Sequence, residues 1–287
     1  MEYVLEVKNL EKHYEHFSVK NVSFKIPKGY IMGFIGPNGA GKTTTIKAIL
    51  GMLNISGGDI NLFGTPVHGK NSHFNEQIGI VMDSPFFVED WNASDIEAAV
   101  APFYPHWDKG HYKSLLRKFS IDQKKKLKDL SRGMKVKLMI SVALSHRASF
   151  LILDEPTSGL DPVAREELCD LLSEFVTDEN NSVLFSTHIT SDLERIADYI
   201  TFILNGEIIY TGTKDELLET YSLVKGSLPE ISKDQKKLLI GTREYSTGFE
   251  AMVRTSDIPK LPDRLLTEPI TLDEIIVFMN KEGKSNE

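Results

Sequence analysis

Residues 36–44 read Gly-Pro-Asn-Gly-Ala-Gly-Lys-Thr-Thr and match the whole phosphate-binding pattern GxxxxGK[ST]. An apolar run, Ile31–Ile35, comes directly before them. The apolar residues that follow have the spacing of one helix face, and they are Ile46, Ile49, Leu50 and Leu53. We therefore expect the glycines to lie between a strand and a helix, which is the setting in which this pattern binds phosphate.

This loop predicts a nucleotide site. Successive backbone N–H groups and the start of a helix together attract an anion. The Lys42 side chain adds a positive charge for the β- and γ-phosphates, and the Thr43 hydroxyl is placed to ligate Mg²⁺. The expected ligands are ATP and Mg²⁺. The loop residues expected to bind the nucleotide are Gly36, Pro37, Asn38, Gly39, Ala40, Gly41, Lys42, Thr43 and Thr44.

Carboxylates at the end of a second apolar run predict the catalytic half of the site. Phe150–Leu153 reads as a short buried strand, and Asp154 and Glu155 follow it. Asp154 would hold Mg²⁺ through water, and Glu155 would polarise the attacking water as a general base or a positioning group. The other interpretation of this pair is an acidic helix cap. His188 follows another predicted strand and is expected at the γ-phosphate, although a lone histidine is more often structural.

A second anion site is expected between these motifs. Leu130-Ser131-Arg132-Gly133-Met134 precedes a helical pattern, so Ser131 and the Gly133 N–H would face an anion at a helix N-terminus. One ATP already occupies the loop at Lys42. A second phosphate site in one chain therefore implies that the chain contacts the nucleotide of a partner.

The ordered motifs, from GPNGAGKTT through LSRGM and LDEPTSGLD to the later His188, resemble the nucleotide-binding subunit of an ABC transporter over about residues 3–220. The resemblance implies that two such subunits clamp two ATP molecules head to tail, each site joining one chain's phosphate loop to the other's LSRGM segment. It also implies that Asp161 contributes to the nucleotide site and that Tyr14 stacks on adenine. A buried core tyrosine is the alternative for Tyr14.

Two departures from the family pattern stand out. Asp83 replaces the expected glutamine, where it could reach Mg²⁺ or water or could be an ordinary loop aspartate. Arg132 and Met134 replace a glycine and a glutamine in LSRGM. Because Ser131 and Gly133 are kept, we expect an active site with Glu155 and His188 as its catalytic residues.

The expected fold is α/β, with a P-loop NTPase core, an antiparallel β subdomain and a helical signature subdomain at about residues 86–146. Residues 1–221 would form the ATPase domain. Residues 222–287 would form a small C-terminal α/β appendage, in which only the last helix, capped by Thr271 and Glu274, has a clear signal. We also expect a capping box at Ser191 and Glu194 and a hairpin turning at Asn205-Gly206.

Composition indicates the partners and the cellular compartment to expect. The net charge is −8, so no nucleic-acid partner is expected. The single cysteine, Cys169, cannot form an internal disulfide, which is typical of a reducing cytosol. No apolar run approaches the roughly 20 residues of a membrane span. A membrane role would therefore require a separate transmembrane permease subunit, with this chain bound peripherally at the cytoplasmic face of the cell membrane.

The predicted function is that of an ATP-hydrolysing motor subunit of a membrane transporter. The chain resembles separate ATPases of the ABC-2 exporter type, which implies export of a drug, peptide or other amphipathic compound. The second ATPase subunit would be another copy or a paralogue. Phe86, Phe87 and Trp91 are candidates for the permease-docking surface or for ordinary core positions. The alternatives are a soluble ABC ATPase acting on ribosomes or DNA and a non-hydrolytic nucleotide sensor, which Glu155 disfavours.

Overall fold

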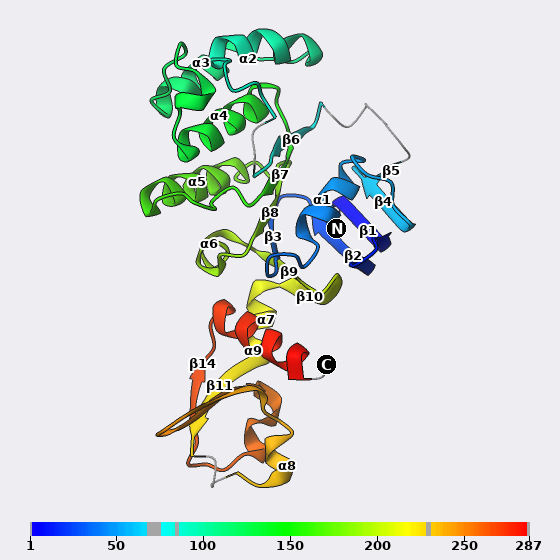
Figure 1. Ribbon diagram of the computed structural model, residues 1–287, viewed down its shortest axis with the longest axis vertical. Coiled ribbons are helices and arrows are strands. Elements are labelled where there is room, and N and C mark those ends of the chain that lie inside the picture. The colour runs from blue at the N-terminus through cyan, green and yellow to red at the C-terminus, as the bar shows by residue number, and fades with distance from the viewer. Residues whose placement is uncertain (1, 68–75, 84–85, 228–230, 286–287) are drawn as a thin grey trace. The chain divides into compact units, whose positions relative to one another are not determined.

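The computed structural model describes residues 2–67, 76–83, 86–227 and 231–285 (Figure 1). It divides into two compact units, Met1–Thr211 and Gly212–Glu287. This division falls before the domain boundary expected after residue 221, because helix α7 (Lys214–Thr220) packs against the first strand of the second unit. The extent of the ATPase domain, 1–221, stays a prediction.

A six-stranded sheet organises the first unit, in the order β10-β9-β3-β8-β7-β6. Its central strands are parallel, so their carboxyl ends meet at one edge. The loop at 36–41 follows β3, Asp154 ends β7 and His188 follows β8, all at that edge. The strands are β3 (Ile31–Ile35), β6 (Ile78–Val81), β7 (Phe150–Asp154), β8 (Ser182–Thr187), β9 (Tyr199–Leu204) and β10 (Glu207–Thr213).

The hairpin predicted at Asn205-Gly206 is confirmed. It joins β9 to β10, and both turn residues have positive φ, 49° and 81°, as a type I′ turn requires. A side chain at Gly206 would place its Cβ 1.9 Å from the Ser18 carbonyl oxygen. The turn therefore needs glycine for both its φ and the close approach of the Ser18 backbone.

Helices cover both faces of this sheet. In Figure 1, α5 (Pro162–Phe175) and α6 (Thr190–Ile196) lie on one side and α1 (Lys42–Ile49) on the other. The capping box expected at Ser191 and Glu194 is wrong, because α6 begins at Thr190 and its N-cap residue, Ile189, makes no side-chain cap.

The helix after the phosphate loop is shorter than its apolar spacing suggests. Gly51 has φ 65°, and the Met52 N–H bonds the Lys47 carbonyl at 2.9 Å, which is the geometry that ends a helix at a left-handed residue. Leu50 is the C-cap and Leu53 lies beyond the helix, yet both still pack against the core.

An antiparallel sheet in the order β2-β1-β4-β5 shares the core of α1 and β3. Its strands are β1 (Tyr3–His13), β2 (Ser18–Pro27), β4 (Gly57–Leu62) and β5 (Thr65–Pro66). Alternating apolar residues of β1 and β2 are buried here, namely Leu5, Val7, Val22, Phe24 and Ile26. This sheet is the expected antiparallel β subdomain.

The helical part lies between β6 and β7. It contains α2 (Ala93–Val100), η2 (Ala101–Phe103), α3 (Lys109–Lys118), η3 (Leu127–Asp129) and α4 (Arg132–Ser145). These elements enclose their own apolar cluster around Tyr112, whose hydroxyl donates to the Ala93 carbonyl at 2.9 Å. Phe87 and Trp91 pack against this cluster, whereas the side chain of Phe86 is 67% exposed. Of the three docking candidates, Phe86 is the one with its ring on the surface.

The second unit is a four-stranded antiparallel sheet with helices, in the order β12-β13-β11-β14. Its elements after α7 are β11 (Tyr221–Gly226), α8 (Lys233–Lys236), β12 (Ile240–Tyr245), β13 (Gly248–Arg254), η5 (Thr255–Lys260), β14 (Leu266–Pro269) and α9 (Leu272–Ser285). The Thr271 hydroxyl and the Glu274 side chain contact each other at the start of α9, which confirms the predicted cap.

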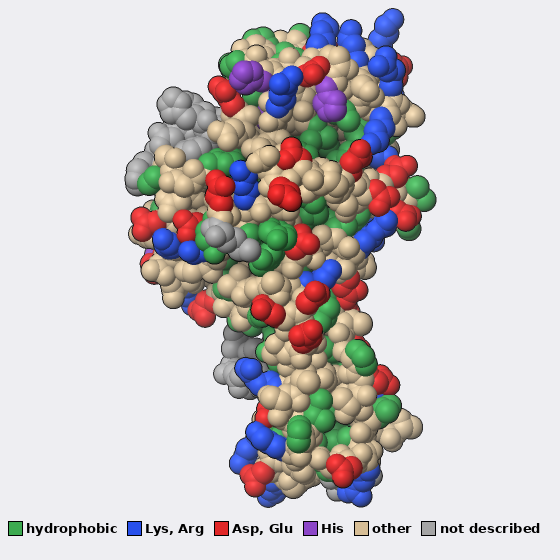
Figure 2. Space-filling model, turned by 180° about the vertical axis from the view of Figure 1, so that it is seen from behind, with side chains coloured by type: hydrophobic (Ala, Val, Ile, Leu, Met, Phe, Trp, Pro, Cys, Tyr) green, Lys and Arg blue, Asp and Glu red, His purple; other side chains and the backbone are tan. Residues whose placement is uncertain are grey.

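Within the described ranges, no helix combines the length and the apolar character that crossing a membrane requires. Acidic and basic side chains are interspersed over the face shown in Figure 2.

Cys169 on α5 is a core residue with a suppressed reactivity. Its side chain is 2% exposed, and burial, with the nearby Asp192 carboxylate, raises the pKa of the thiol to about 11. Since the thiolate is the nucleophile, we expect native protein at pH 8 to react with a thiol reagent only as fast as it unfolds. Labelling in urea is the control and should be fast. Rapid stoichiometric labelling of native protein at pH 8 would contradict this burial.

Candidate functional site

The phosphate loop follows β3 at the carboxyl edge of the sheet. Its backbone conformation and its close approach to β9 require glycine at particular positions. Gly39 and Gly41 have φ of 81° and 112°, a region that other residues rarely adopt. A Cβ at Gly36 would lie 2.3 Å from the Ile203 carbonyl oxygen. The loop can therefore lie close to β9 only with glycine at position 36.

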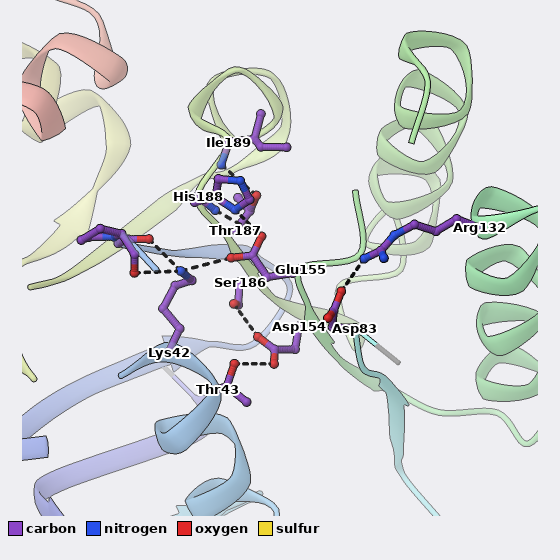
Figure 3. A network of polar contacts seen from close by, with 12 residues as sticks. Lys42, Thr43, Asp83, Arg132, Asp154, Glu155, Ser186, Thr187, His188 and Ile189 are labelled. Carbon is purple, nitrogen blue, oxygen red and sulfur yellow. Dashed lines mark hydrogen bonds and ion pairs between the residues drawn. The ribbon is translucent and has the colours of Figure 1, made fainter. Parts of the chain in front are cut away.

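Lys42 is a buried cation held by oxygen atoms. Its side chain is 5% exposed. The Nζ donates to the carbonyl oxygens of Gly36 at 2.7 Å and Pro37 at 3.3 Å, and it lies 3.1 Å from Oε1 of Glu155 (Figure 3). Because a buried ammonium group is costly without such partners, these contacts fix the loop against the end of β7.

Asp154 accepts two hydrogen bonds. The Thr43 hydroxyl donates to its Oδ2 and the Ser186 hydroxyl to its Oδ1, each at 2.8 Å, and the residue is 1% exposed. The sequence predicted Thr43 and Asp154 as magnesium ligands, and the fold brings them into contact. A hydroxyl and a carboxylate are suitable donors for Mg²⁺. The described residues hold no cluster of three or more His, Cys, Asp or Glu side chains that could bind a metal alone.

Glu155 lies between the lysine and the histidine. Its Oε2 is 2.7 Å from Nδ1 of His188, and its Oε1 is the atom beside Lys42. Its backbone has φ 52°, an uncommon value for a residue with a side chain, and its N–H donates to the Ser186 carbonyl at 2.9 Å. Such strained positions cluster at functional sites. The two predicted catalytic residues are thus in direct contact.

The remaining predicted residues lie at helix starts. Ser131 is the N-cap of α4 and its Oγ accepts from the Met134 N–H at 3.3 Å, while Gly133 is in the first turn. Asp161 is the N-cap of α5 and accepts from the Ala164 N–H at 3.0 Å. Within the described part of the chain, no hydrogen bond or ion pair joins these residues to the Lys42–Glu155–His188 cluster.

Comparison with known proteins identifies the family. The ABC transporter family profile matches residues 19–158. The chain is 34% identical over 209 residues to the lantibiotic transport ATP-binding protein SrtF of Streptococcus pyogenes, which covers 72% of this chain and 89% of that protein. The chain belongs to the ABC transporter ATP-binding family. Membership confirms the resemblance and the ATPase class.

Other relatives agree with this ABC ATPase assignment. The bacitracin transport ATP-binding protein BcrA of Enterococcus faecalis is 32% identical over 212 residues, covering 73% of this chain and 69% of that protein. YhcH of Bacillus subtilis, an uncharacterized ABC transporter ATP-binding protein, is 28% identical over 287 residues and covers 97% of this chain. Among solved structures, an ABC transporter ATP-binding subunit has a TM-score of 0.68 and 31% identity, covering 75% of this chain and 91% of that chain. This match confirms the fold predicted from the motifs.

Tyr14 of the ABC ATPase is a surface residue. It is 49% exposed, and the Lys12 ammonium lies 5.2 Å from the centroid of its ring. Tyr14, Gly39 and Asn205 line one surface hollow, so the ring lies beside the phosphate loop. The alternative of a buried core tyrosine does not describe this geometry.

Sequence reasoning missed three contacts of the site. These are the Ser186 hydroxyl on Asp154, the Lys42–Glu155 ion pair, and an ion pair between Arg132 and Asp83. The first could have been found from strand register, because Asp154 and Ser186 are partners in the parallel β7–β8 pair. The other two join segments whose approach has no local signal.

Ser186 should stabilise the site even without nucleotide. In Ser186→Ala, Oδ1 of the buried Asp154 loses its donor, and an unsatisfied buried group costs about 1–3 kcal/mol. We expect a loss of that size in the free energy of unfolding, measured by urea denaturation of nucleotide-free protein. Ser114 is exposed on α3, so Ser114→Ala is the matched control and should change stability by less than about 0.5 kcal/mol. Equal stabilities for the two variants would contradict this role of the hydroxyl.

Proposed function

We propose that this ABC ATPase drives an exporter of peptides, drugs or similar amphipathic compounds. The observation that carries the proposal is the Lys42–Glu155–His188 cluster at the carboxyl edge of the sheet, in a chain of this family. The export direction and the cargo class come from the relatives named for bacitracin and lantibiotic transport. A ribosome- or DNA-associated ATPase is the alternative within the family.

ATP would place its phosphates beside Lys42. Lys42 pairs with Glu155, and its Nζ has the reach to serve the β- and γ-phosphates instead. Thr43 and Asp154 would hold Mg²⁺, with Asp83 as a further oxygen donor from the end of β6. The ion would supply charge neutralisation on the phosphates. When Lys42 moves to the phosphates, Oε1 of Glu155 becomes available to a water molecule.

Glu155 and His188 would then carry the hydrolysis. Glu155 accepts a proton from the attacking water or orients it, and its Oε2 contact keeps the carboxylate beside the His188 ring. His188 is 40% exposed, so its ring has access to a γ-phosphate arriving at the loop. A non-hydrolytic sensor has no need of a carboxylate held in this strained position.

The positions of Ser131, Gly133 and Asp161 support a two-chain site. Each lies at a helix start, where unpaired N–H groups favour an anion. We infer that Ser131 and Gly133 bind the ATP of a second ATPase subunit, which is another copy or a paralogue. Tyr14 would stack on the adenine at the side of the phosphate loop.

Glu155→Gln tests the catalytic assignment and the dimer together. The amide keeps the side-chain size but accepts no proton, so hydrolysis should fall by about 10²- to 10⁴-fold. We expect the variant to bind Mg·ATP and to elute as a dimer in gel filtration with ATP but not with ADP. Glu166 is exposed on α5, so Glu166→Gln is the matched control and should hydrolyse ATP normally. Wild-type activity in Glu155→Gln would overturn the assignment of the catalytic carboxylate.

The membrane partner is the second test. This chain would lie peripherally at the cytoplasmic face of the cell membrane and bind a separate permease through its helical part, residues 86–146. We expect the tagged chain to co-purify a membrane-spanning protein from solubilised host membranes. Phe86→Ser should weaken that recovery, whereas Ile209→Ser, an exposed change on β10, should not. Recovery of ribosomal proteins or DNA in place of a membrane protein would favour the alternative function.

A further inference from the structure

The two departures from the family pattern contact each other. Nη2 of Arg132 forms an ion pair with Oδ1 of Asp83, across 49 positions of sequence (Figure 3). Asp83 comes just after β6, and Arg132 is the first residue of α4. The pair therefore joins the two ends of the helical part of the ABC ATPase.

The pair also lies next to the catalytic strand. β6 runs parallel to β7 with Val81 opposite Leu153, so Asp83 leaves the sheet at the same edge as Asp154 and Glu155. The Arg132 stem passes over Gly159, where a Cβ would be 3.1 Å from Cδ of Arg132. Gly159 has φ 70°, so this glycine suits both its backbone conformation and the passage of the arginine. Arg132 thus contacts two loops that follow neighbouring strands.

We propose that Arg132 is a positioning residue for Mg·ATP in its own chain, acting through Asp83. It engages Oδ1 of Asp83 and neutralises its charge, which leaves Oδ2 as the oxygen available to the metal or its water. This inference rests on the proposed function, because it concerns the nucleotide site at Lys42.

Electrostatics predicts whether losing either partner weakens or strengthens the binding of Mg·ATP. Asp154 and Glu155 already place two carboxylates at this edge of the sheet, and ATP brings further negative charge. Without Arg132, the Asp83 carboxylate would repel the nucleotide. Without Asp83, Arg132 would stand as an unpaired cation at the positive end of α4, which is unfavourable for that helix. Removing both partners at once avoids both penalties.

The alternative to a positioning role is an ordinary surface ion pair that does not affect nucleotide binding. The side chains of Arg132 and Asp83 are 42% and 56% exposed, so the pair contributes little to folding in either case. A purely structural pair would show its small effect only in the unfolding of nucleotide-free protein and would leave nucleotide affinity unchanged. A positioning pair changes the affinity for Mg·ATP.

A double-mutant cycle distinguishes a positioning role of the Arg132–Asp83 pair from a purely structural one. The variants are Arg132→Gln, Asp83→Asn and the double variant, each as the full chain. The measurements are the Kd for Mg·ATP by calorimetry, kcat and KM for hydrolysis, and the urea midpoint without nucleotide. We expect Arg132→Gln to raise Kd and KM by about two- to fivefold in the wild-type background, and to change them much less in the Asp83→Asn background. Arg132→Lys keeps the positive charge, so its affinity for Mg·ATP should stay closer to that of wild type than the affinity of Arg132→Gln.

The matched control is an exposed ion pair on the helical part and α5, Lys118 with Glu174, whose charged atoms are 3.1 Å apart. Lys118→Gln and Glu174→Gln should leave Kd unchanged. Additive effects of the Arg132 and Asp83 variants on Kd, or coupling seen in the urea midpoint alone, would overturn the positioning role. If wild-type protein binds Mg·ATP and the cycle is additive, this inference alone fails. If wild-type protein does not bind Mg·ATP, the proposed function fails with it.

Discussion

The burial of the Lys42 ammonium group constrains the whole nucleotide site. A charge that is 5% exposed needs oxygen partners, and these come from the carbonyls of Gly36 and Pro37 and from Glu155. The first two lie after β3 and the third after β7, so the site exists only while those strands are in one sheet with β8 between them. The same edge brings Thr43 to Asp154 and His188 to Glu155.

The sequence predicted most of this edge because its signals are local. The strand, glycine loop and helix around Lys42 are contiguous, and the positive φ of Gly39, Gly41 and Gly206 follows from residue type. The α6 cap was predicted wrongly, because α6 begins at Thr190 and its N-cap residue is Ile189, two residues before the Ser191 that the pattern indicated. The strands of the second unit gave weak signals. β11 pairs with β13 and β14 from far along the chain, although β12 and β13 form a local hairpin.

Long-range pairs were the other limit of sequence reasoning. Asp83 and Arg132 each appeared as a separate departure from the family pattern, and only the fold brings them together. Ser186 was passed over because a serine in a buried strand resembles any other core position until the register places it opposite Asp154. The role of a single residue can thus be predicted from its motif, whereas contacts between residues far apart in the sequence are seen only in the fold.

The structure of the wild-type chain with Mg²⁺ and a non-hydrolysable ATP analogue is the most direct test of how this site works. If the Lys42 ammonium group exchanges a protein carboxylate for phosphate, its Nζ should lie against the β- and γ-phosphates and away from position 155. Ser131 of a second subunit should then contact the γ-phosphate. A nucleotide bound elsewhere, or bound at the loop with Lys42 still turned towards position 155, would contradict the exchange.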